Sequence, residues 1–198
     1  TSIGDYAFSK CPALEEIVIP SSLNVIGQSL FSDTDNIVRF SGNSPYVTSD
    51  NRCFIWPNVR GGGNDVLKFA GGGGILEYTI PSGHDIILLN ANSFHSTTLK
   101  RLTLIEGLSI NSAALTGLTS LEGIYGPNTS SDHRAVVDGD KLVSLVVAQG
   151  IDEYRVPDDI TKIGYMAFNG LKGLKSVTMG DQVTSIAGYT FFGCPDLE

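Results

Sequence analysis

Short apolar segments recur along this chain at a spacing of about 23 residues. Four apolar positions of the first copy return together, with Ile3, Phe8, Leu14 and Ile17 reappearing as Ile26, Phe31, Ile37 and Phe40. The same spacing relates Ile163, Phe168 and Leu174 to Ile186, Phe191 and Leu197 near the other end. A repeat of this length predicts a solenoid, in which each turn buries its apolar face only against its neighbours.

Within each copy, an element of the form L-x-x-I-x-I alternates apolar and polar residues. Such alternation predicts a short strand with its apolar residues facing inward. The element aligns seven times, centred on Ile17, Phe40, Tyr78, Leu102, Ile124, Tyr154 and Val177. We therefore expect a right-handed β-solenoid of about seven rungs with one parallel sheet and little regular helix. The Phe of the A-F pair is expected to fill the core on the side opposite the sheet.

Two intervals between rungs are longer than the others and predict inserted hairpins. Phe40 and Tyr78 are 38 positions apart, and Ile124 and Tyr154 are 30 apart. One insert, near residues 50–72, leads through a Gly-rich loop that includes Gly61–Gly63. The other, near residues 133–148, turns at Asp138-Gly139-Asp140, which is a hairpin signal.

A string that recurs in the sequence resembles a known repeat family. The pattern IPSSLxxIGxxxFxxxxxL is present at Ile19–Ile37 and returns as VPDDITKIGYMAFNGLKGL at Val156–Leu174. It resembles the BspA-type leucine-rich repeat family of bacterial surface proteins. The resemblance implies an exported protein that binds host or matrix proteins, or other cells, and it supplies no catalytic residues.

The resemblance and the composition together set expectations for the whole chain. We interpret residues 1–198 as a single leucine-rich repeat solenoid that is a fragment of a longer protein, displayed on the bacterial surface by an anchor outside it. The net charge of −8 and the pI near 4.7 argue against nucleic acid and anionic membranes as partners. Its longest apolar run, Ile86–Leu89, is far shorter than the roughly 18 residues that span a bilayer.

Outward-facing rung residues are the first candidates for binding. One column begins Glu16, Arg39, Glu77, Arg101, and its alternating signs favour a stabilising ladder over a ligand site. Tyr125 and Arg155 are the better contact residues, because Tyr and Arg are common binding anchors. The wider set of predicted partner-binding residues is Tyr125, Arg155, Arg101, Thr103, Thr79 and Trp56. For Trp56, on the first hairpin, packing against the solenoid is the more common fate.

Catalytic and metal-binding interpretations find little support in the sequence. Glu77 and Glu153 are three rungs apart, which is too far for a glycosidase pair. Ser131, Asp132 and His133 are consecutive, whereas a hydrolytic triad is assembled from separated positions. We therefore expect a polar loop there, no enzyme activity, no cofactor and no metal site.

The function predicted from these residues is binding. The outward face of the strands and the tips of the hairpins would contact an extracellular or host protein, or a glycan. An alternative is an architectural spacer that carries a functional domain outside this chain. A third hypothesis, degradation of a glycan by the solenoid itself, is weaker because of the carboxylate spacing above.

Overall fold

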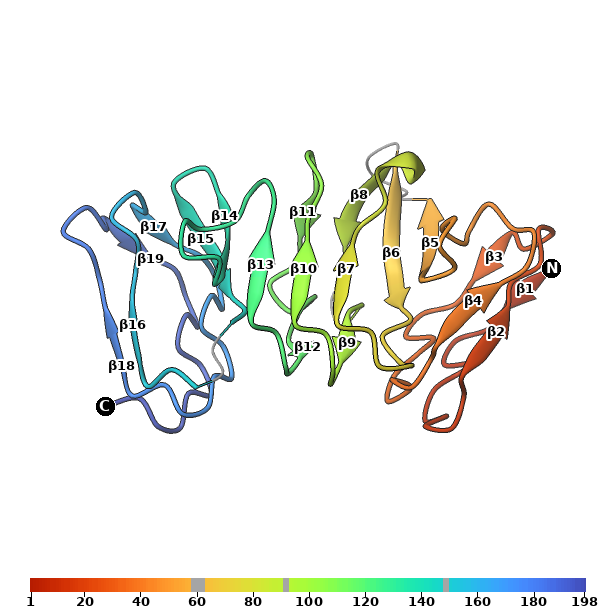
Figure 1. Ribbon diagram of the computed structural model, residues 1–198, viewed down its shortest axis with the longest axis horizontal. Coiled ribbons are helices and arrows are strands. Elements are labelled where there is room, and N and C mark those ends of the chain that lie inside the picture. The colour runs from red at the N-terminus through yellow and green to blue at the C-terminus, as the bar shows by residue number, and fades with distance from the viewer. Residues whose placement is uncertain (58–62, 91–92, 148–149) are drawn as a thin grey trace. The chain divides into compact units, whose positions relative to one another are not determined.

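The chain forms a β-solenoid of about eight turns in a computed structural model (Figure 1). The structure describes residues 1–57, 63–90, 93–147 and 150–198. Internal contacts divide it into two compact units, which interleave in sequence. The first unit holds residues 1–76, 81–99 and 107–119; the second holds residues 77–80, 100–106 and 120–198. That residues 1–198 act as a single domain stays a prediction.

All seven predicted rungs are strands. They are β2 (Glu16–Val18), β4 (Arg39–Ser41), β7 (Glu77–Thr79), β10 (Arg101–Thr103), β13 (Gly123–Tyr125), β16 (Glu153–Arg155) and β18 (Ser176–Thr178). The central residue of each points into the core, as Phe40 and Leu102 do with no exposed surface. Neighbouring rungs pair in parallel and in the predicted register, for example Leu102 with Tyr78 and with Ile124.

The expectation of one continuous sheet along these rungs was wrong. The rungs form three parallel sheets, β2-β4, β7-β10-β13 and β16-β18. The predicted ladder of Glu16, Arg39, Glu77 and Arg101 therefore breaks between Arg39 and Glu77. Each break falls where a hairpin is inserted, because a turn of the insert occupies the edge of the preceding strand. The Phe40 amide donates to the Asn51 carbonyl at 2.9 Å, and the Ile124 amide donates to the His133 carbonyl at 2.9 Å.

The two edge-capping turns share one sequence pattern, [ST]-x-D-x-R, at Thr48–Arg52 and at Ser130–Arg134. In the second turn, Asp132 accepts hydrogen bonds from the Ser130 hydroxyl and from the Arg134 amide, the latter at 3.1 Å. The first turn repeats this arrangement with its own Thr, Asp and Arg. The predicted polar loop at Ser131–His133 is confirmed, and its residues are held in a structural turn.

The two predicted hairpins are present. The first pairs β5 (Cys53–Pro57) with β6 (Asn64–Phe69), and the second pairs β14 (Ala135–Asp138) with β15 (Lys141–Leu145), both antiparallel. Gly61 and Gly62 of the predicted loop lie outside the described residues, as does the last residue of the second predicted insert. The second strand of each hairpin also pairs in parallel with a later strand. β6 pairs with β8 (Ile86–Leu89), and β15 pairs with β17 (Lys162–Ile163).

A second set of strands was not predicted. These strands are β1 (Ser2–Ile3), β3 (Val25–Ile26), β8 (Ile86–Leu89), β11 (Ser109–Ile110), β17 (Lys162–Ile163) and β19 (Ser185–Ile186). β9 (His95–Ser96) and β12 (Gly117–Leu118) form a further two-stranded parallel sheet. Ser82–His84 form a 3-10 turn. Most of these strands have two residues, too few to show an alternating pattern in the sequence.

Aromatic rings fill the core opposite the rung strands, as predicted. Phe8 stacks on Phe31 with ring centroids 5.6 Å apart, and Phe168 stacks on Phe191 at 5.1 Å. Each pair joins equivalent positions of successive turns. The stacking therefore continues the repeat into the core and links each turn to the next.

The backbone takes the left-handed conformation at two places around the Phe of these turns. Two residues before it stand Tyr6, Ser29, Met166 and Tyr189, and two residues after it stand Lys10, Asp33, Gly170 and Gly193, all with positive φ. Only glycine adopts this conformation without steric cost. At the position two residues after the Phe, Lys10 and Asp33 thus adopt a strained conformation where the later copies carry Gly.

Candidate functional site

The sheet formed by β7, β10 and β13 carries four of the six predicted binding residues. Two outward rows cross it. One row runs Glu77, Arg101, Gly123, and the other runs Thr79, Thr103, Tyr125. Both rows lie within the second unit, and Figure 1 shows the three strands side by side. The predicted neighbours Arg101, Thr103, Thr79 and Tyr125 are thus brought together.

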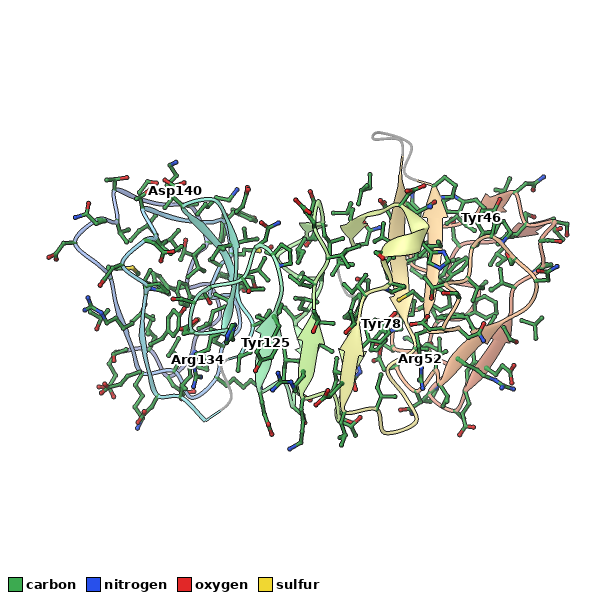
Figure 2. The ribbon with its side chains drawn as sticks, turned by 45° about the horizontal axis from the view of Figure 1, so that its top comes forward. Tyr46, Arg52, Tyr78, Tyr125, Arg134 and Asp140 are labelled. Carbon is green, nitrogen blue, oxygen red and sulfur yellow. The ribbon has the colours of Figure 1, made fainter. Side chains whose placement is uncertain are left out.

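Arg101 and Tyr125 are in direct contact on this face. The guanidinium carbon of Arg101 lies 4.2 Å from the centroid of the Tyr125 ring, within the range of a cation–π interaction. On its other side, Arg101 Nε is 3.8 Å from Glu77 Oε1. The Tyr125 ring also lies against His133, with ring centroids 4.5 Å apart. We call Glu77, Arg101, Tyr125 and His133 the strand-face cluster; Figure 2 labels Tyr125 within it.

The strand-face cluster is ordered by its own contacts and still reaches solvent. The side chains of Arg101 and Glu77 are 50% and 74% exposed, while Tyr125 is half-buried. An exposed ion pair of this length contributes little to stability. The contacts of Tyr125 with Arg101 and His133 restrict its side chain. Binding of a partner would therefore cost little further side-chain entropy at Tyr125.

His133 is the member of the cluster that the sequence did not reveal as a candidate. Its backbone is left-handed, with φ of 58°. His133 is the fourth residue of its capping turn, and Asn51 occupies the equivalent position in the other capping turn. Recognising the repeated [ST]-x-D-x-R pattern would have placed His133 at the edge of β13. Its ring would then have been expected near Tyr125, because the turn caps that strand.

Arg155 is on a different sheet from Arg101 and Tyr125. It belongs to β16, which pairs with β18 and with no other described strand. Its guanidinium forms an ion pair with Asp158 at 2.7 Å, and both side chains are largely exposed. A surface depression of about 450 Å³ surrounds it, lined also by Ser131, Asp132 and Asp159. Arg155 and Tyr125 are thus on strands of two different sheets, and their joint role in binding stays a prediction.

Trp56 packs against its own hairpin. Its ring centroid lies 4.5 Å from that of Tyr46 and 6.5 Å from that of Phe54, and it is half-buried against the core of the first unit. This is the packing role that the sequence favoured for the only Trp. As a binding residue, Trp56 stays a prediction.

On the sheet of β2 and β4, the outward charges form a closed pair. Arg39 donates to Glu16 at 2.7 Å, and the Ser41 hydroxyl donates to the same carboxylate at 2.7 Å. The hydrogen bond from Arg39, followed by that from Ser41, lowers the pKa of Glu16. This part of the predicted ladder has the scaffold character assigned to it from the sequence.

Tyr154 is the one group with a large pKa shift among the described residues. Burial raises the pKa of its hydroxyl, and the nearby Asp132 carboxylate raises it further. The phenol therefore stays neutral at any physiological pH. It lies in the core of the second unit, below the capping turn, and serves packing.

The part of the chain that the structure describes contains neither a metal-binding cluster nor a membrane-spanning helix. No group of three or more His, Cys, Asp or Glu side chains there is arranged to hold a metal ion. Among the same residues, no helix has the length and apolarity needed to cross a bilayer.

Comparisons with known proteins agree on the repeat. A family model described as the BspA type leucine rich repeat region matches six copies, over residues 1–59 and 148–198. No curated protein matches the chain. The unmatched centre, residues 60–147, contains strands β6 to β15.

Three solved structures are similar over almost all of this chain. A leucine-rich repeat protein from Eubacterium ventriosum is 21% identical, with a TM-score of 0.59, over 100% of this chain and 50% of that one. A leucine rich cell surface protein from Faecalibacterium prausnitzii is 22% identical, with a TM-score of 0.67, over 100% and 50%. The pneumococcal vaccine antigen PcpA is 24% identical, with a TM-score of 0.61, over 98% and 46%. The chain thus spans about half the length of each, and the likeness concerns the fold.

Proposed function

This chain belongs to the BspA-type leucine-rich repeat family, and on that premise we propose that it is a surface-displayed module that binds an extracellular macromolecule through the strand-face cluster. The observation that carries the proposal is the stacking of Arg101 on Tyr125 at 4.2 Å. The partner we propose is a host or matrix protein, with a glycan as the other possible class.

The composition of the cluster supports a protein partner. Tyr and Arg account for a large share of the binding energy in many protein interfaces, where a few central residues dominate. Here Arg101 and Tyr125 are in contact. Thr79 and Thr103, in the same row as Tyr125, add side chains that can form hydrogen bonds. The cluster carries one Arg and one Glu, so it favours a surface of mixed charge over a polyanion.

The surface location rests on family membership and on one neighbour. The family model covers more than half of the chain, and the printed name of the Faecalibacterium prausnitzii neighbour describes a cell surface protein. We infer that this chain is exported and displayed in the same way. We also infer a non-enzymatic role, since the cluster pairs each charged group with a neighbour and leaves no carboxylate pair for acid–base catalysis.

Binding of the purified chain to immobilised extracellular-matrix proteins and glycans, by biolayer interferometry, tests the proposal. Wild type is compared with Tyr125→Ala, Arg101→Ala and the double variant. Arg39→Ala is the matched control, because Arg39 is also an exposed, paired arginine on a rung strand, in a different sheet. Each single cluster variant should weaken binding at least tenfold. The loss of affinity in the double variant should be smaller than the product of the two single-variant losses, because the two residues contact each other.

Two outcomes would contradict the proposal. Binding that Arg39→Ala reduces as much as Arg101→Ala would move the site away from the strand-face cluster. An absence of saturable binding by the wild type across the panel would favour the spacer hypothesis, in which the solenoid only carries another domain.

A further inference from the structure

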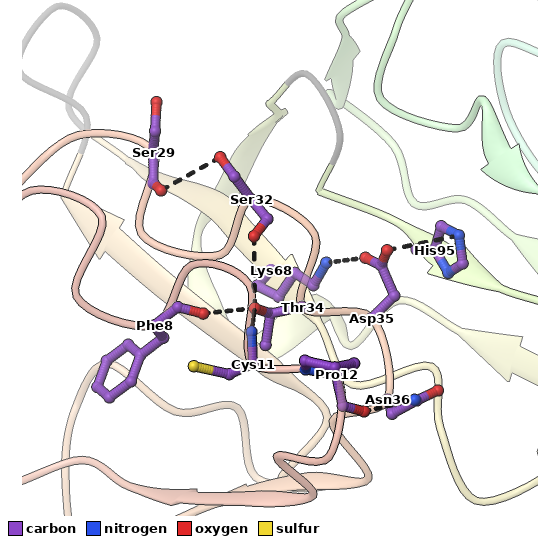
Figure 3. Close-up of polar contacts among 10 residues, drawn as sticks. All are labelled: Phe8, Cys11, Pro12, Ser29, Ser32, Thr34, Asp35, Asn36, Lys68 and His95. Carbon is purple, nitrogen blue, oxygen red and sulfur yellow. Dashed lines mark hydrogen bonds and ion pairs between the residues drawn. The ribbon is translucent and has the colours of Figure 1, made fainter.

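A buried lysine lies beside a cavity in the first unit. The side chain of Lys68, on β6, is only 3% exposed, and its ammonium donates to Asp35 Oδ1 at 2.6 Å. The second oxygen of Asp35 faces His95 Nε2 at 3.7 Å (Figure 3). The cavity has a volume of about 810 Å³ and is lined by these three residues and by others of the first unit.

The first hairpin contributes to the lining of this cavity. One wall is the segment of residues 26–33, which leads from β3 towards β4, and the opposite wall is formed by Asn90, His95 and Thr116. Strand β6 lies between them and contributes Leu67 and Lys68. We call the space the hairpin cavity.

The polar groups of the hairpin cavity can both donate and accept hydrogen bonds. Lys68 uses one donor on Asp35 and keeps two further N–H groups. The distance of 3.7 Å from Asp35 Oδ2 to His95 is longer than a hydrogen bond, so this oxygen, in a side chain that is 35% exposed, can accept another donor. Ser29, Ser32 and Thr116, which carry hydroxyl groups, also line the cavity.

The charges of the cavity disfavour an ionic ligand. Asp33 and Asp35 are negative and Lys68 is positive, which leaves a small negative balance that does not suit an anion. A cation would compete with the buried ammonium of Lys68 for the same carboxylate. A neutral ligand rich in hydroxyl groups avoids both conflicts, because each hydroxyl can donate to Asp35 and accept from Lys68 or His95.

We propose that the hairpin cavity binds a neutral saccharide of one or two sugar units. The volume lies in the range of small-molecule sites, roughly 300–1,000 Å³. Half-buried Ile26 and Leu67 line the cavity and offer an apolar surface for the C–H face of a sugar ring. The site is separate in residues from the strand-face cluster, so the two proposals stand independently.

Saturation-transfer difference NMR followed by isothermal titration calorimetry tests the site. The probes are glucose, galactose, N-acetylglucosamine, maltose and lactose, with inorganic phosphate and a neutral tripeptide as probes of other classes. At least one sugar should bind saturably, with a Kd between about 10 μM and 10 mM. Phosphate and tripeptide should not bind at the same concentrations.

Three variants locate the binding. Asp35→Asn removes the charged acceptor, and Thr116→Trp introduces a bulky ring at an exposed residue that lines the cavity. Both should weaken sugar binding at least tenfold while the circular dichroism spectrum stays unchanged. Lys141→Met is the matched control, because it removes a lysine ion pair on the second hairpin, that with Asp138 at 3.0 Å. This variant should bind like wild type.

The proposal is overturned if no sugar binds saturably, or if phosphate or the tripeptide binds in place of the sugars. Sugar binding that survives Thr116→Trp in a folded protein also overturns it, because the ligand would then lie elsewhere. None of these results bears on the strand-face cluster, whose test uses different variants and a different sheet.

Discussion

Tyr125 folds back over Gly123, two residues before it, so closely that a β-carbon placed on Gly123 would lie 2.6 Å from the Tyr125 hydroxyl oxygen. Gly123 is also the register partner of Arg101 on the neighbouring strand. The missing side chain therefore provides the space through which the Tyr125 ring reaches Arg101. A glycine in a strand interior is unfavourable by itself, and this contact explains its place in β13.

Substituting Gly123→Val should displace the Tyr125 ring and separate it from Arg101. The contact is worth about 0.5–1 kcal/mol at an exposed site. The ring-current shift of the Arg101 δ-protons, measured by NMR, should be lost. Ser176→Val, at the corresponding position of a sheet whose outward rows hold no Tyr, is the control and should leave the Arg101 signals in place. Unchanged Arg101 shifts in Gly123→Val would refute the packing role of Gly123.

Lys10→Gly should stabilise the protein. Lys10 has φ of 56°, and the equivalent positions of later turns carry Gly170 and Gly193. Relief of the left-handed strain, partly offset by the greater entropy of glycine in the unfolded chain, should leave about 0.5–1 kcal/mol. Urea unfolding measures the gain. Lys172→Gly, at a position without positive φ, is the control; an equal gain there would contradict the explanation.

Asp35→Asn should destabilise the first unit more than Lys68→Met does. The first change leaves the buried ammonium of Lys68 without its anionic partner, at a cost of about 1–3 kcal/mol. Lys68→Met instead replaces the buried charge with an apolar chain of similar length, which is often tolerated in buried ion pairs. Thermal unfolding of both variants gives the order. The reverse order would contradict this explanation, because it would show that the Asp35 carboxylate depends on Lys68 more than the buried ammonium depends on Asp35.

The stabilisation provided by Asp140 should depend on pH. The Thr161 hydroxyl donates a hydrogen bond to the Asp140 carboxylate, and this bond, followed by that from Lys162, lowers its pKa from the ordinary 3.8. A carboxyl whose pKa is lower in the folded state stabilises it above the ordinary pKa and loses that effect as the pH falls through the folded value.

The difference in stability between wild type and Asp140→Asn should therefore be fully present at about pH 7 and shrink as the pH falls below the ordinary pKa of 3.8. Urea midpoints at several pH values measure it. Asp138→Asn, on the same hairpin, where the carboxylate pairs with Lys141 at 3.0 Å, is the control. A difference that grows on acidification would contradict the assigned interaction.

The sequence was most informative where a pattern repeats at fixed spacing. The seven rung centres and both hairpins could be predicted because their apolar residues alternate or flank turn signals. The division of the rungs into three sheets could not, since it depends on backbone hydrogen bonds from Phe40 and Ile124 to inserted turns. An insertion length alone does not reveal which carbonyl caps a strand edge.

The candidate sites show the same limit. Arg101, Tyr125, Thr79 and Thr103 were expected on one face because register follows directly from the repeat. His133 joined them through the fold of a turn. The pairing of Lys68 with Asp35 spans 33 positions and belongs to no repeat, so only the three-dimensional structure reveals it.

Backbone hydrogen bonds between successive turns have a mechanical consequence. The Phe8 amide donates to the Leu30 carbonyl, and the Phe168 amide donates to the Thr190 carbonyl, each linking one turn to the next. A load that pulls neighbouring turns apart acts along such bonds, which then open a few at a time. Within each unit, extension should therefore begin at modest force and proceed turn by turn, so that tension is absorbed gradually instead of in one abrupt rupture.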